Sequence, residues 1–386
     1  MALQKEKTRI GLALSGGGVR AAAFHAGVLQ YLAEQGKLEE VTHISSVSGG
    51  SLFTGLVYSS NFNTWPDSRQ YLGVSLPHVR NLLTTTNLQY SALVRLLLIP
   101  SNWRYLLSRA NVIAQTIGTL WGIGGALRDI GDKPVWSING TTAETGKRFR
   151  FKAGQFGDYL IGYATAPSFP LKNALAVSAA FPGGVGPLSI NSNEFAWRKK
   201  KNWDAQGSAE EVVPDHKRLH LYDGGVYDNL GLEPLFDVGR QRFKAQDGST
   251  IDKLFVSDAG SPLQNTVIPS QLNPFRFKRL VDIMLDQTRA IRVRSFVNFL
   301  QNNPSGGAYV MIGTDAIKSL EDFGHANEAT KGKLLERKWL SLEEAVSAKQ
   351  YPTNLEKMTE DAFDLVARHG YETAMWNCEL FSVWDS

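Results

Sequence analysis

A serine flanked by small residues is the first candidate for chemistry in this sequence. Ser48 lies in the stretch HISSVSGGSL, in which a run ending at Val47 is followed by the serine and two glycines. A nucleophilic serine at a tight strand-to-helix turn needs small neighbours, and the usual pattern for it is G-x-S-x-G. Ser46 replaces the first glycine of that pattern, and Gly50 supplies the second. Ser48 is therefore either a nucleophile or one more residue of a Ser/Gly-rich turn.

A nucleophilic serine also needs a base. None of the seven histidines lies in a motif suited to that role; His25 falls in a predicted helix and His43 in a predicted strand. Asp223 is a better candidate, because it ends an apolar strand and precedes Gly224 and Gly225, which allow another backbone to approach closely. A carboxylate is a weak base at its ordinary pKa of about 4, so burial must raise that pKa. The alternative is a turn aspartate, which the Asp-Gly pair favours.

Three glycines, Gly16, Gly17 and Gly18, separate a predicted strand from a predicted helix. Backbone N–H groups at such a helix start point towards an anion. Phosphate is one candidate, but the Walker sequence Gly-Lys-Ser/Thr is absent, and Ala21 takes the place of the third glycine of G-x-G-x-x-G. The same groups can form an oxyanion hole. A purely structural glycine turn is the third alternative.

The elements that must position these residues alternate between strand and helix. Alternating apolar residues predict a strand at 10–14, and a helical pattern follows over 19–35, with a second strand at 41–47 and a second helix at 49–60. Strand–helix–strand spacing of this kind implies a parallel sheet with right-handed crossovers. Farther on, the patterns predict a turn between extended segments at 141–151, a helix ending near Pro182, a strand that ends in a glycine-rich loop over 218–231, and a strand at 253–260. We expect one α/β domain over 1–386, with a mostly parallel sheet flanked by helices.

Two regions are expected to be mostly helical additions to that domain, an insertion at 61–135 and a C-terminal region at 335–386. In the C-terminal region, Thr353 and Glu356 form a predicted capping box, and Gly370 is the predicted helix stop. In the insertion, residues 91–127 predict an amphipathic helix from Arg104, with its apolar face running from Leu106 to Leu120. This helix is expected to be a lid, an interfacial helix or, as we favour, a helix packed on the protein's own core.

Composition places the chain among ordinary globular proteins. Of its 386 residues 43% are hydrophobic, no apolar run reaches the length of a bilayer, and the start lacks the apolar core of a signal peptide. The single cysteine, Cys378, excludes an internal disulfide framework and fits a buried apolar site better than a metal site. The net charge of +4 is mild, and the basic stretches 197–203 and 277–296 are predicted to be an exposed loop and a surface helix, so no nucleic-acid partner is expected.

Four blocks of this sequence resemble those of patatin-like phospholipases, and they occur in the same order. They are Gly16 to Arg20, the turn around Ser48, the stretch AVSAAFP at 176–182, and Asp223 to Gly225, and the resemblance runs from about residue 8 to 260. The resemblance implies Ser48 as nucleophile, Asp223 as base, and an oxyanion hole at Gly16, Gly17 and Gly18. Supporting residues would be Arg20, Gly49, Gly224 and Gly225, with Arg20 near a lipid phosphate or bracing the loop through a salt bridge of its own. Ser46 departs from the commonest family pattern.

The implied activity is hydrolysis of (phospho)lipid acyl esters through an acyl-enzyme, with no metal or organic cofactor. We expect a cytoplasmic protein that meets lipid peripherally at a membrane surface. One alternative is an esterase or acyltransferase with another substrate, and a second is a membrane-damaging effector switched on by a ligand or protein. A third is a phosphate-binding module in which Ser48 is silent.

Overall fold

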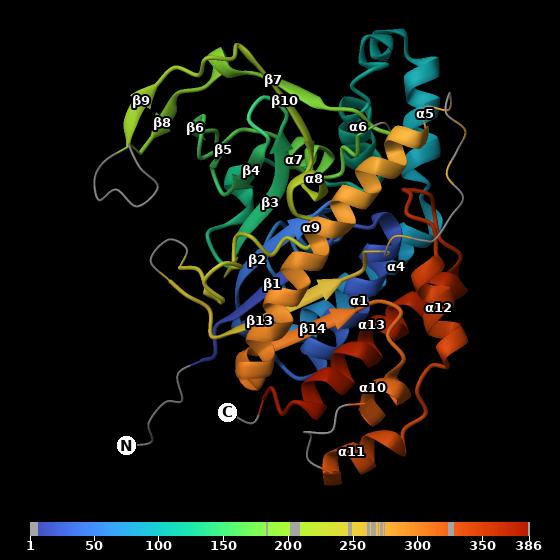
Figure 1. Cartoon of the computed structure of the whole chain (residues 1–386). Coiled ribbons are helices and arrows are strands. Elements are labelled where there is room, and N and C mark those ends of the chain that lie inside the picture. Colours follow the sequence, from blue (N-terminus) through green and yellow to red (C-terminus); the bar gives the residue numbers. More distant parts are fainter. Residues whose placement is uncertain are drawn as a thin grey trace.

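A mixed β-sheet lies at the centre of the computed structural model (Figure 1). The structure describes residues 7–182, 184–200, 209–245, 249–260, 263, 268, 270, 273, 275–322 and 328–384. One half of the sheet is parallel, in the order β14–β13–β1–β2–β3. Its strands are β1 Ile10–Leu14, β2 Val41–Val47, β3 Val135–Thr142, β13 Lys253–Asp258 and β14 Gly307–Met311. Strands β1, β2 and β13 match the predicted segments.

The other half of the sheet is antiparallel and continues from β3. Hairpin connections of a few residues join β3 to β4, β4 to β5 and β5 to β6, and the first of them is the predicted turn. A separate branch of the same sheet pairs β10 with both β3 and β7. The strands are β4 Lys147–Lys152, β5 Gln155–Asp158, β6 Gly162–Thr165, β7 Leu188–Asn191, β8 Trp197–Lys199, β9 Glu210–Val212 and β10 Arg218–Asp223, and a small hairpin adds β11 Phe236–Asp237 and β12 Arg242–Phe243.

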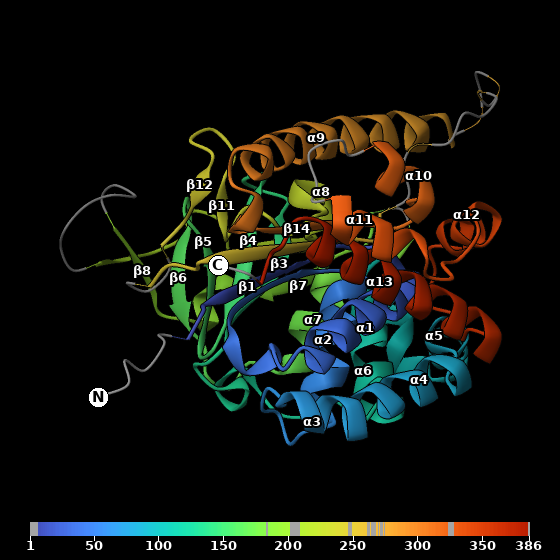
Figure 2. The ribbon, with the colours of Figure 1, turned by 90° about the horizontal axis from the view of Figure 1, so that it is seen from below.

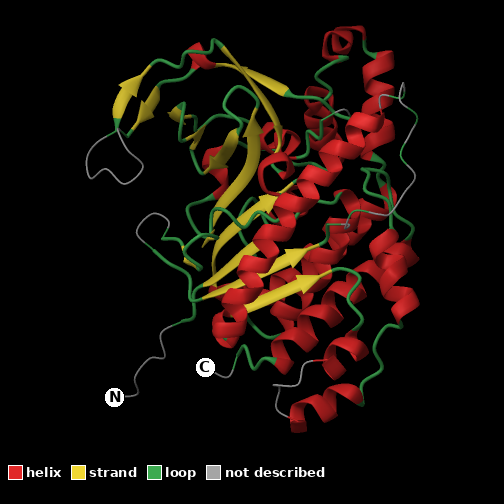
Figure 3. Cartoon of the chain, viewed as in Figure 1, coloured by secondary structure: helices red, strands yellow, loops and turns green. Residues whose placement is uncertain are grey.

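Helices cover both faces of the parallel half, as Figure 2 shows. On one face lie α1 Gly18–Glu34, α2 Gly49–Ser59, α7 Leu171–Ser178 and α13 Glu360–Leu380, and on the other lie α8 Gly225–Asp228 and the long α9 Phe275–Asn302. Figure 3 shows the same layers by secondary structure. The expected class, a mostly parallel α/β sheet between helices, is confirmed, and the basic stretch 277–296 lies within α9 as a helix.

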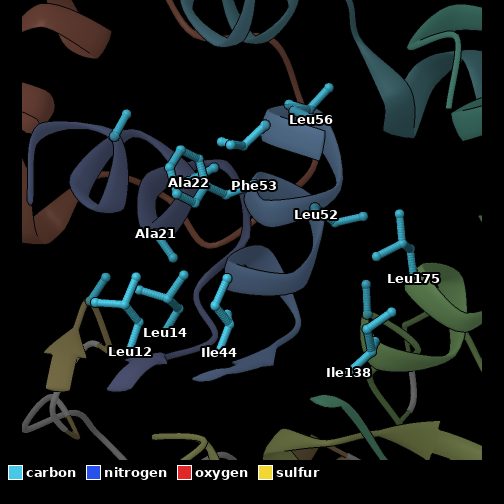
Figure 4. Packing of buried hydrophobic residues seen from close by; sticks show 14 of the residues in the cluster. Leu12, Leu14, Ala21, Ala22, Ile44, Leu52, Phe53, Leu56, Ile138 and Leu175 are labelled. Carbon is cyan, nitrogen blue, oxygen red and sulfur yellow. The ribbon is translucent and has the colours of Figure 1, made fainter. Parts of the chain in front are cut away.

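The core beneath the catalytic candidates joins the first two helices to the first two strands. Leu12 and Leu14 of β1 and Ile44 of β2 point towards Phe53 of α2 and Ala22 of α1, and all are buried (Figure 4). Each fully buried aliphatic or aromatic side chain contributes about 1.5–3 kcal/mol relative to exposure. The two loops that follow β1 and β2 are therefore fixed on a rigid base.

The C-terminal helix differs from the prediction. It begins at Glu360, with Thr359 as the N-cap accepting a hydrogen bond from the Ala362 N–H, so the capping box at Thr353 and Glu356 is wrong. It also continues through Gly370 to Leu380. A Cβ at Gly370 would lie 2.1 Å from the Phe24 carbonyl oxygen of α1. Gly370 therefore serves close helix packing and is not a helix stop.

The segment between β2 and β3 contains the helices α3 Ser68–Gln70, α4 Leu76–Thr85, α5 Leu88–Leu98 and α6 Ala110–Leu120. The helix predicted from Arg104 starts only at Ala110, because a 3₁₀ segment at Pro100–Tyr105 precedes it. Ile113 and Ile117 are buried as expected, whereas Leu106 and Leu120 are exposed. The predicted apolar face is thus correct in its middle and wrong at both ends.

The predicted exposed loop at 197–203 is also wrong where the structure describes it. Residues Trp197–Lys199 form β8, and the Trp197 ring is buried against Phe156 with its Nε1–H donated to the Ser192 carbonyl. Residues 201–203 lie outside the described part. Tertiary pairing with β6 and β9 overrides the loop-like composition of this stretch.

The remaining helices of the described C-terminal part are α10 Ala316–Asp322, α11 Glu328–Leu335 and α12 Leu342–Gln350. Cys378, in α13, is buried as expected. None of the described helices is long and apolar enough to cross a bilayer.

Candidate active site

Two tight turns lie side by side at the carboxyl ends of β1 and β2, which are adjacent and parallel. The first contains Gly16 and Gly17, and the second places Ser48 between β2 and α2. Ser48 has φ 49° and ψ −119°, a backbone conformation that is rare for a residue with a side chain and is typical of strained functional turns. The sequence expectation of a serine at a strand-to-helix turn is confirmed.

The glycines after Ser48 are required by close backbone packing. A Cβ at Gly49 would lie 2.2 Å from the carbonyl oxygen of Gly18, and one at Gly50 would lie 2.5 Å from that of Leu14. Contacts below 3.0 Å are essentially never made by real Cβ atoms. The turn at Ser48 and the glycine loop therefore touch backbone to backbone, and any side chain at these two positions would force them apart.

The Ser48 backbone is held from the other side by Ser178, the last residue of α7. The Ser48 N–H lies 3.1 Å from the Ser178 carbonyl oxygen and 3.0 Å from its Oγ. The Ser178 hydroxyl in turn donates to the carbonyl oxygen of Asn139 in β3, at 2.7 Å. The AVSAAFP stretch thus supports the serine turn directly.

Ser46, which stands in place of the usual glycine, takes part in a buried hydrogen-bond chain. Its Oγ accepts the indole N–H of Trp136 at 2.8 Å and lies 2.8 Å from the Oγ of Ser51, which lies 2.8 Å from that of Ser178. Ser46 is completely buried. Its hydroxyl therefore satisfies a buried indole that a glycine would leave without this partner.

Strand β3 brings Asp223 to Ser48. Val47, next to Ser48, pairs with Asn139 of β3, and Asp223 pairs with the next residue, Gly140, on the same edge of β3, because β4 occupies the opposite edge. The Asp223 N–H donates to the Ala180 carbonyl at 3.1 Å, and Asp223 is only 3% exposed. The register of three neighbouring strands therefore sets the distance between the serine turn and the carboxylate.

The glycines after Asp223 have separate roles. A Cβ at Gly224 would lie 2.4 Å from the Asn139 carbonyl oxygen, so this position packs against β3. The Gly225 N–H donates to Oδ1 of Asp223 at 2.7 Å, which fixes the carboxylate. Both glycines support Asp223, as the sequence led us to expect.

Burial raises the pKa of Asp223 to about 7, and its hydrogen bonds with the Gly225 N–H and the Ser48 side chain counteract only part of that effect. Burial disfavours the charged carboxylate because the protein interior solvates it less well than water does. A base with a pKa near neutral pH has both enough ionised form and enough proton affinity to accept a hydroxyl proton. The environment of Asp223 thus removes the objection that a carboxylate is too weak a base.

The glycine loop differs from the prediction at Gly16. The Gly16 N–H already donates to the carbonyl oxygen of Asn229 at 3.0 Å, and the Val19 N–H donates to that of Asn354, also at 3.0 Å. Within the described ranges, the N–H groups of Gly17 and Gly18 have no recorded acceptor, and these residues have φ 146° and 62°. The arrangement leaves Gly17 and Gly18 as available anion donors at the start of α1, and not Gly16.

Arg20 is buried beneath this loop and braces it without an ion pair to any residue that the structure describes. Its guanidinium donates to the carbonyl oxygens of Tyr351 at 2.7 Å, Ala259 at 3.0 Å and Lys349 at 3.2 Å. Burial lowers its pKa to about 10, while the nearby charge of Asp258 acts in the opposite direction. Arg20 thus braces the loop, as expected, but through hydrogen bonds to backbone carbonyl oxygens.

One cavity of about 1310 Å³ contains Ser48, Asp223 and all three loop glycines in its lining. A large part of its wall is apolar and comes from α5, α6 and the segment after α7. Another part is charged and comes from α9. The apolar part includes Ala92, Leu93, Leu96, Val112, Ile113, Phe181 and Val185, and the α9 part includes Arg279, Asp282, Asp286 and Arg289. Such a cavity exceeds the usual 300–1000 Å³ of small-ligand sites and suits a large amphiphile.

No histidine contributes to the described lining of this cavity. His25 is fully buried in α1, where burial lowers its pKa to about 4 and keeps the ring neutral. Its Nε2 donates to the Ser15 carbonyl at 2.9 Å, and its Nδ1 lies 2.7 Å from the Ser257 hydroxyl. His43 lies 2.9 Å from Thr42 Oγ1. Both residues have structural contacts, and neither is among the described residues that line the cavity with Ser48.

Three residues that support the site were not predicted from the sequence. Ser178 stands within a recognised block, but nothing distinguished its hydroxyl from the neighbouring small residues. Asn139 donates its side-chain amide to the Ser46 carbonyl at 2.9 Å, and Asn229 lines the cavity beside Gly16. No local signal identifies either asparagine, because both act through strand pairing and loop packing. In the part of the chain that the structure describes, no three His, Cys, Asp or Glu residues form a metal-binding group.

Comparison with known proteins adds a family and a fold. A family model described as patatin-like phospholipase matches residues 12–236, more than half of the chain. Human GIVD cytosolic phospholipase A2 has the same fold, with a TM-score of 0.52 and 14% sequence identity over 99% of this chain and 61% of its own. The same human protein in complex with methyl γ-linolenyl fluorophosphonate matches with a TM-score of 0.51 and 14% identity over 98% of this chain.

The chain thus covers 61% and 58% of the lengths of those two solved structures, and at these identities the likeness shows the fold alone. None of the curated proteins compared with the sequence matches it significantly.

Proposed function

Because the chain belongs to the patatin-like phospholipase family, we propose that it is a lipid acyl hydrolase with Ser48 as nucleophile and Asp223 as base. The observation that carries the proposal is the shared cavity: a serine at a strained turn and a buried carboxylate with a pKa of about 7 open onto the same space and interact. This combination satisfies the requirement of a nucleophile next to a matched base.

In the proposed reaction, the Ser48 hydroxyl attacks the carbonyl carbon of an ester while Asp223 accepts its proton. The N–H groups of Gly17 and Gly18 hold the negative oxygen of the tetrahedral intermediate. Each such donor typically contributes about 3–4 kcal/mol to transition-state stabilisation. The intermediate expels the alcohol, which takes the proton from Asp223, and leaves an acyl-enzyme. Asp223 then takes a proton from a water molecule that attacks the acyl carbon, and it returns this proton to the Ser48 oxygen as the fatty acid is released.

The side chains that line the cavity favour a phospholipid as the ester substrate. Leu93, Leu96 and Ile113 offer a surface on which an acyl chain loses contact with water, at about 0.8 kcal/mol per buried methylene. Arg279 of α9 lines the same cavity, and a guanidinium group pairs well with phosphate, whereas Arg289 is already ion-paired with the buried carboxylate of Asp258. We therefore propose that the acyl chain lies along α5 and α6 and the headgroup lies towards α9.

The test combines lipid mass spectrometry with covalent labelling. Wild type, Ser48→Ala and the control Ser59→Ala are incubated with vesicles that contain phospholipids and neutral lipids, and each is treated with a fluorophosphonate. Ser59 lies at the opposite end of the same helix, so its substitution tests for a general effect on α2. We expect free fatty acid, lysophospholipid and a single labelled site in wild type and Ser59→Ala, and none in Ser48→Ala.

If Ser48 is labelled but no lipid products form, the substrate would be another ester, or the acyl group would pass to an acceptor other than water. Labelled Ser48 whose turnover appears only after addition of cell extract would favour an activated effector. Equal lipid hydrolysis by wild type and Ser48→Ala would contradict the proposal.

A further inference from the structure

An exposed apolar surface surrounds the end of α5 and the segment that follows it. Six large apolar side chains in this region are between 49% and 85% exposed: Leu93, Leu97, Leu98, Trp103, Leu106 and Leu107. Leu93 and Leu97 share one face of α5, while Ala92 and Leu96 on another face are buried. Contiguous exposed apolar surface of this kind typically marks an interaction site. We refer to residues 88–109 as the α5 face.

The α5 face is held in a defined shape by hydrogen bonds. The Trp103 indole N–H donates to the Leu97 carbonyl at 3.1 Å, which fixes the ring against the end of α5. The side chains of Asn102 and Gln115 pair reciprocally at 3.1 Å and connect the segment to α6. The exposed apolar side chains therefore project from an ordered base that Figure 1 shows at one end of the molecule, near the beginning of α9.

The residues of the α5 face carry only positive formal charge, although the Glu356 carboxylate accepts a hydrogen bond from the Gln89 side chain at its edge. Between Asp67 and Asp129 the sequence contains no acidic residue, and residues 88–109 contribute Arg95, Arg104 and Arg109. No ion pair with a described acidic residue is recorded for these three arginines. Apolar and aromatic side chains beside arginines that have no ion pair with a described acidic residue complement a bilayer surface that carries anionic headgroups. A protein partner of ordinary composition would not require this charge bias.

The α5 face is continuous with the cavity of the candidate active site. Leu93 is half exposed on the outer surface and also lines the cavity, together with Ala92, Leu96 and Arg109. One helix thus forms both the inner wall of the cavity and the outer apolar surface. A lipid leaving a bilayer that contacts this surface would reach Ser48 without crossing bulk water.

We propose that the α5 face docks the chain on the surface of an anionic phospholipid membrane and delivers substrate lipid to the cavity. This proposal deepens the proposed function and rests on it for the fate of the lipid. Docking itself requires no chemistry. It is therefore measured in the Ser48→Ala background, where a failure to bind and a failure to hydrolyse are separate results.

The experiment is vesicle flotation of Ser48→Ala with phosphatidylcholine vesicles that contain or lack phosphatidylglycerol. We expect binding to the anionic vesicles that weakens as salt is added. In the same background, Leu107→Glu and Arg104→Glu are each expected to reduce the fraction bound by roughly 10-fold or more, because an apolar contact or about two units of favourable charge are lost. The matched controls are Val213→Glu, with the same 85% exposure as Leu107, and Arg240→Glu, another exposed arginine.

Circular dichroism of every variant verifies that the fold is retained, and sedimentation analysis without vesicles reports self-association. The proposal is overturned if Ser48→Ala does not float with anionic vesicles, or if the control variants lose binding as much as the α5-face variants do. It is also overturned if Leu107→Glu dissociates a dimer while vesicle binding is unchanged, because the face would then be an interface between two copies of the chain.

Discussion

Replacing Asp223 by asparagine is expected to remove lipid hydrolysis and, at the same time, to stabilise the fold at neutral and higher pH. Asparagine keeps the shape of the side chain and an oxygen that accepts the Gly225 N–H, but it has no basic carboxylate. It also removes the free-energy cost of burying a negative charge. That cost is what raises the pKa of Asp223 to about 7. Activity and stability should therefore change in opposite directions.

The magnitude follows from that pKa. In the unfolded chain the ordinary aspartate pKa is 3.8, so the folded protein binds this proton more tightly than the unfolded chain does. The resulting contribution to stability is fully present below about pH 4 and is lost as the pH rises through about 7. Between pH 5 and pH 8 wild type loses about 3 kcal/mol from this group, at about 1.4 kcal/mol per pH unit up to pH 7. For a chain of 386 residues that corresponds to roughly 3–4 °C in Tm.

The assay is thermal unfolding of wild type and Asp223→Asn at pH 5 and pH 8, with lipid hydrolysis measured in parallel. The Tm difference between the two proteins should shift in favour of the variant by a few degrees as the pH rises. Wild-type kcat/KM should rise with pH through about 7 as the base loses its proton. Asp252→Asn is the control, because Arg9 holds the pKa of Asp252 below its ordinary value and the carboxylate is ionised throughout this range.

The reasoning about Asp223 would be refuted by a Tm difference that does not change between pH 5 and pH 8, or by a shift of the same size in Asp252→Asn. Retained hydrolysis by Asp223→Asn would remove the base from the proposed mechanism while leaving the stability argument intact.

Two further predictions test how the site is supported. Ser46→Gly restores the usual family residue but leaves the Trp136 indole N–H without its buried acceptor. The free energy of unfolding, measured in urea titrations, should therefore fall by about 1–3 kcal/mol. An unchanged value would show that another group accepts this hydrogen bond. Gly370→Ala should lower the free energy of unfolding although alanine favours helices, because its Cβ would lie 2.1 Å from the Phe24 carbonyl oxygen. The control Gly332→Ala, in open space on α11, should instead raise the free energy of unfolding by up to about 1 kcal/mol. Equal effects of the two substitutions in urea titrations would contradict the packing argument.

Local patterns in the sequence were sufficient for much of the fold. Strands β1 and β2, with the glycine-containing turns that follow them, were predicted within about a residue, because alternating apolar residues and glycines act through the nearest neighbours in the chain. The order of the motifs led to the family that the family model confirms. Local patterns failed at Gly370 and Trp197, where packing against α1 and pairing with β6 outweigh composition.

The residue types at the candidate site were thus determined by the sequence, but their chemistry was decided by the tertiary structure. Strands β2 and β10 pair with consecutive stretches of one edge of β3, which sets Asp223 beside Ser48, and burial raises the pKa of the carboxylate from 3.8 to about 7. The hydrogen bond from the Gly16 N–H to Asn229 decides which N–H groups of the glycine loop remain available for the proposed oxyanion hole. These properties depend on segments far apart in the chain meeting at one sheet edge, and desolvation and hydrogen-bond competition arise only once they meet.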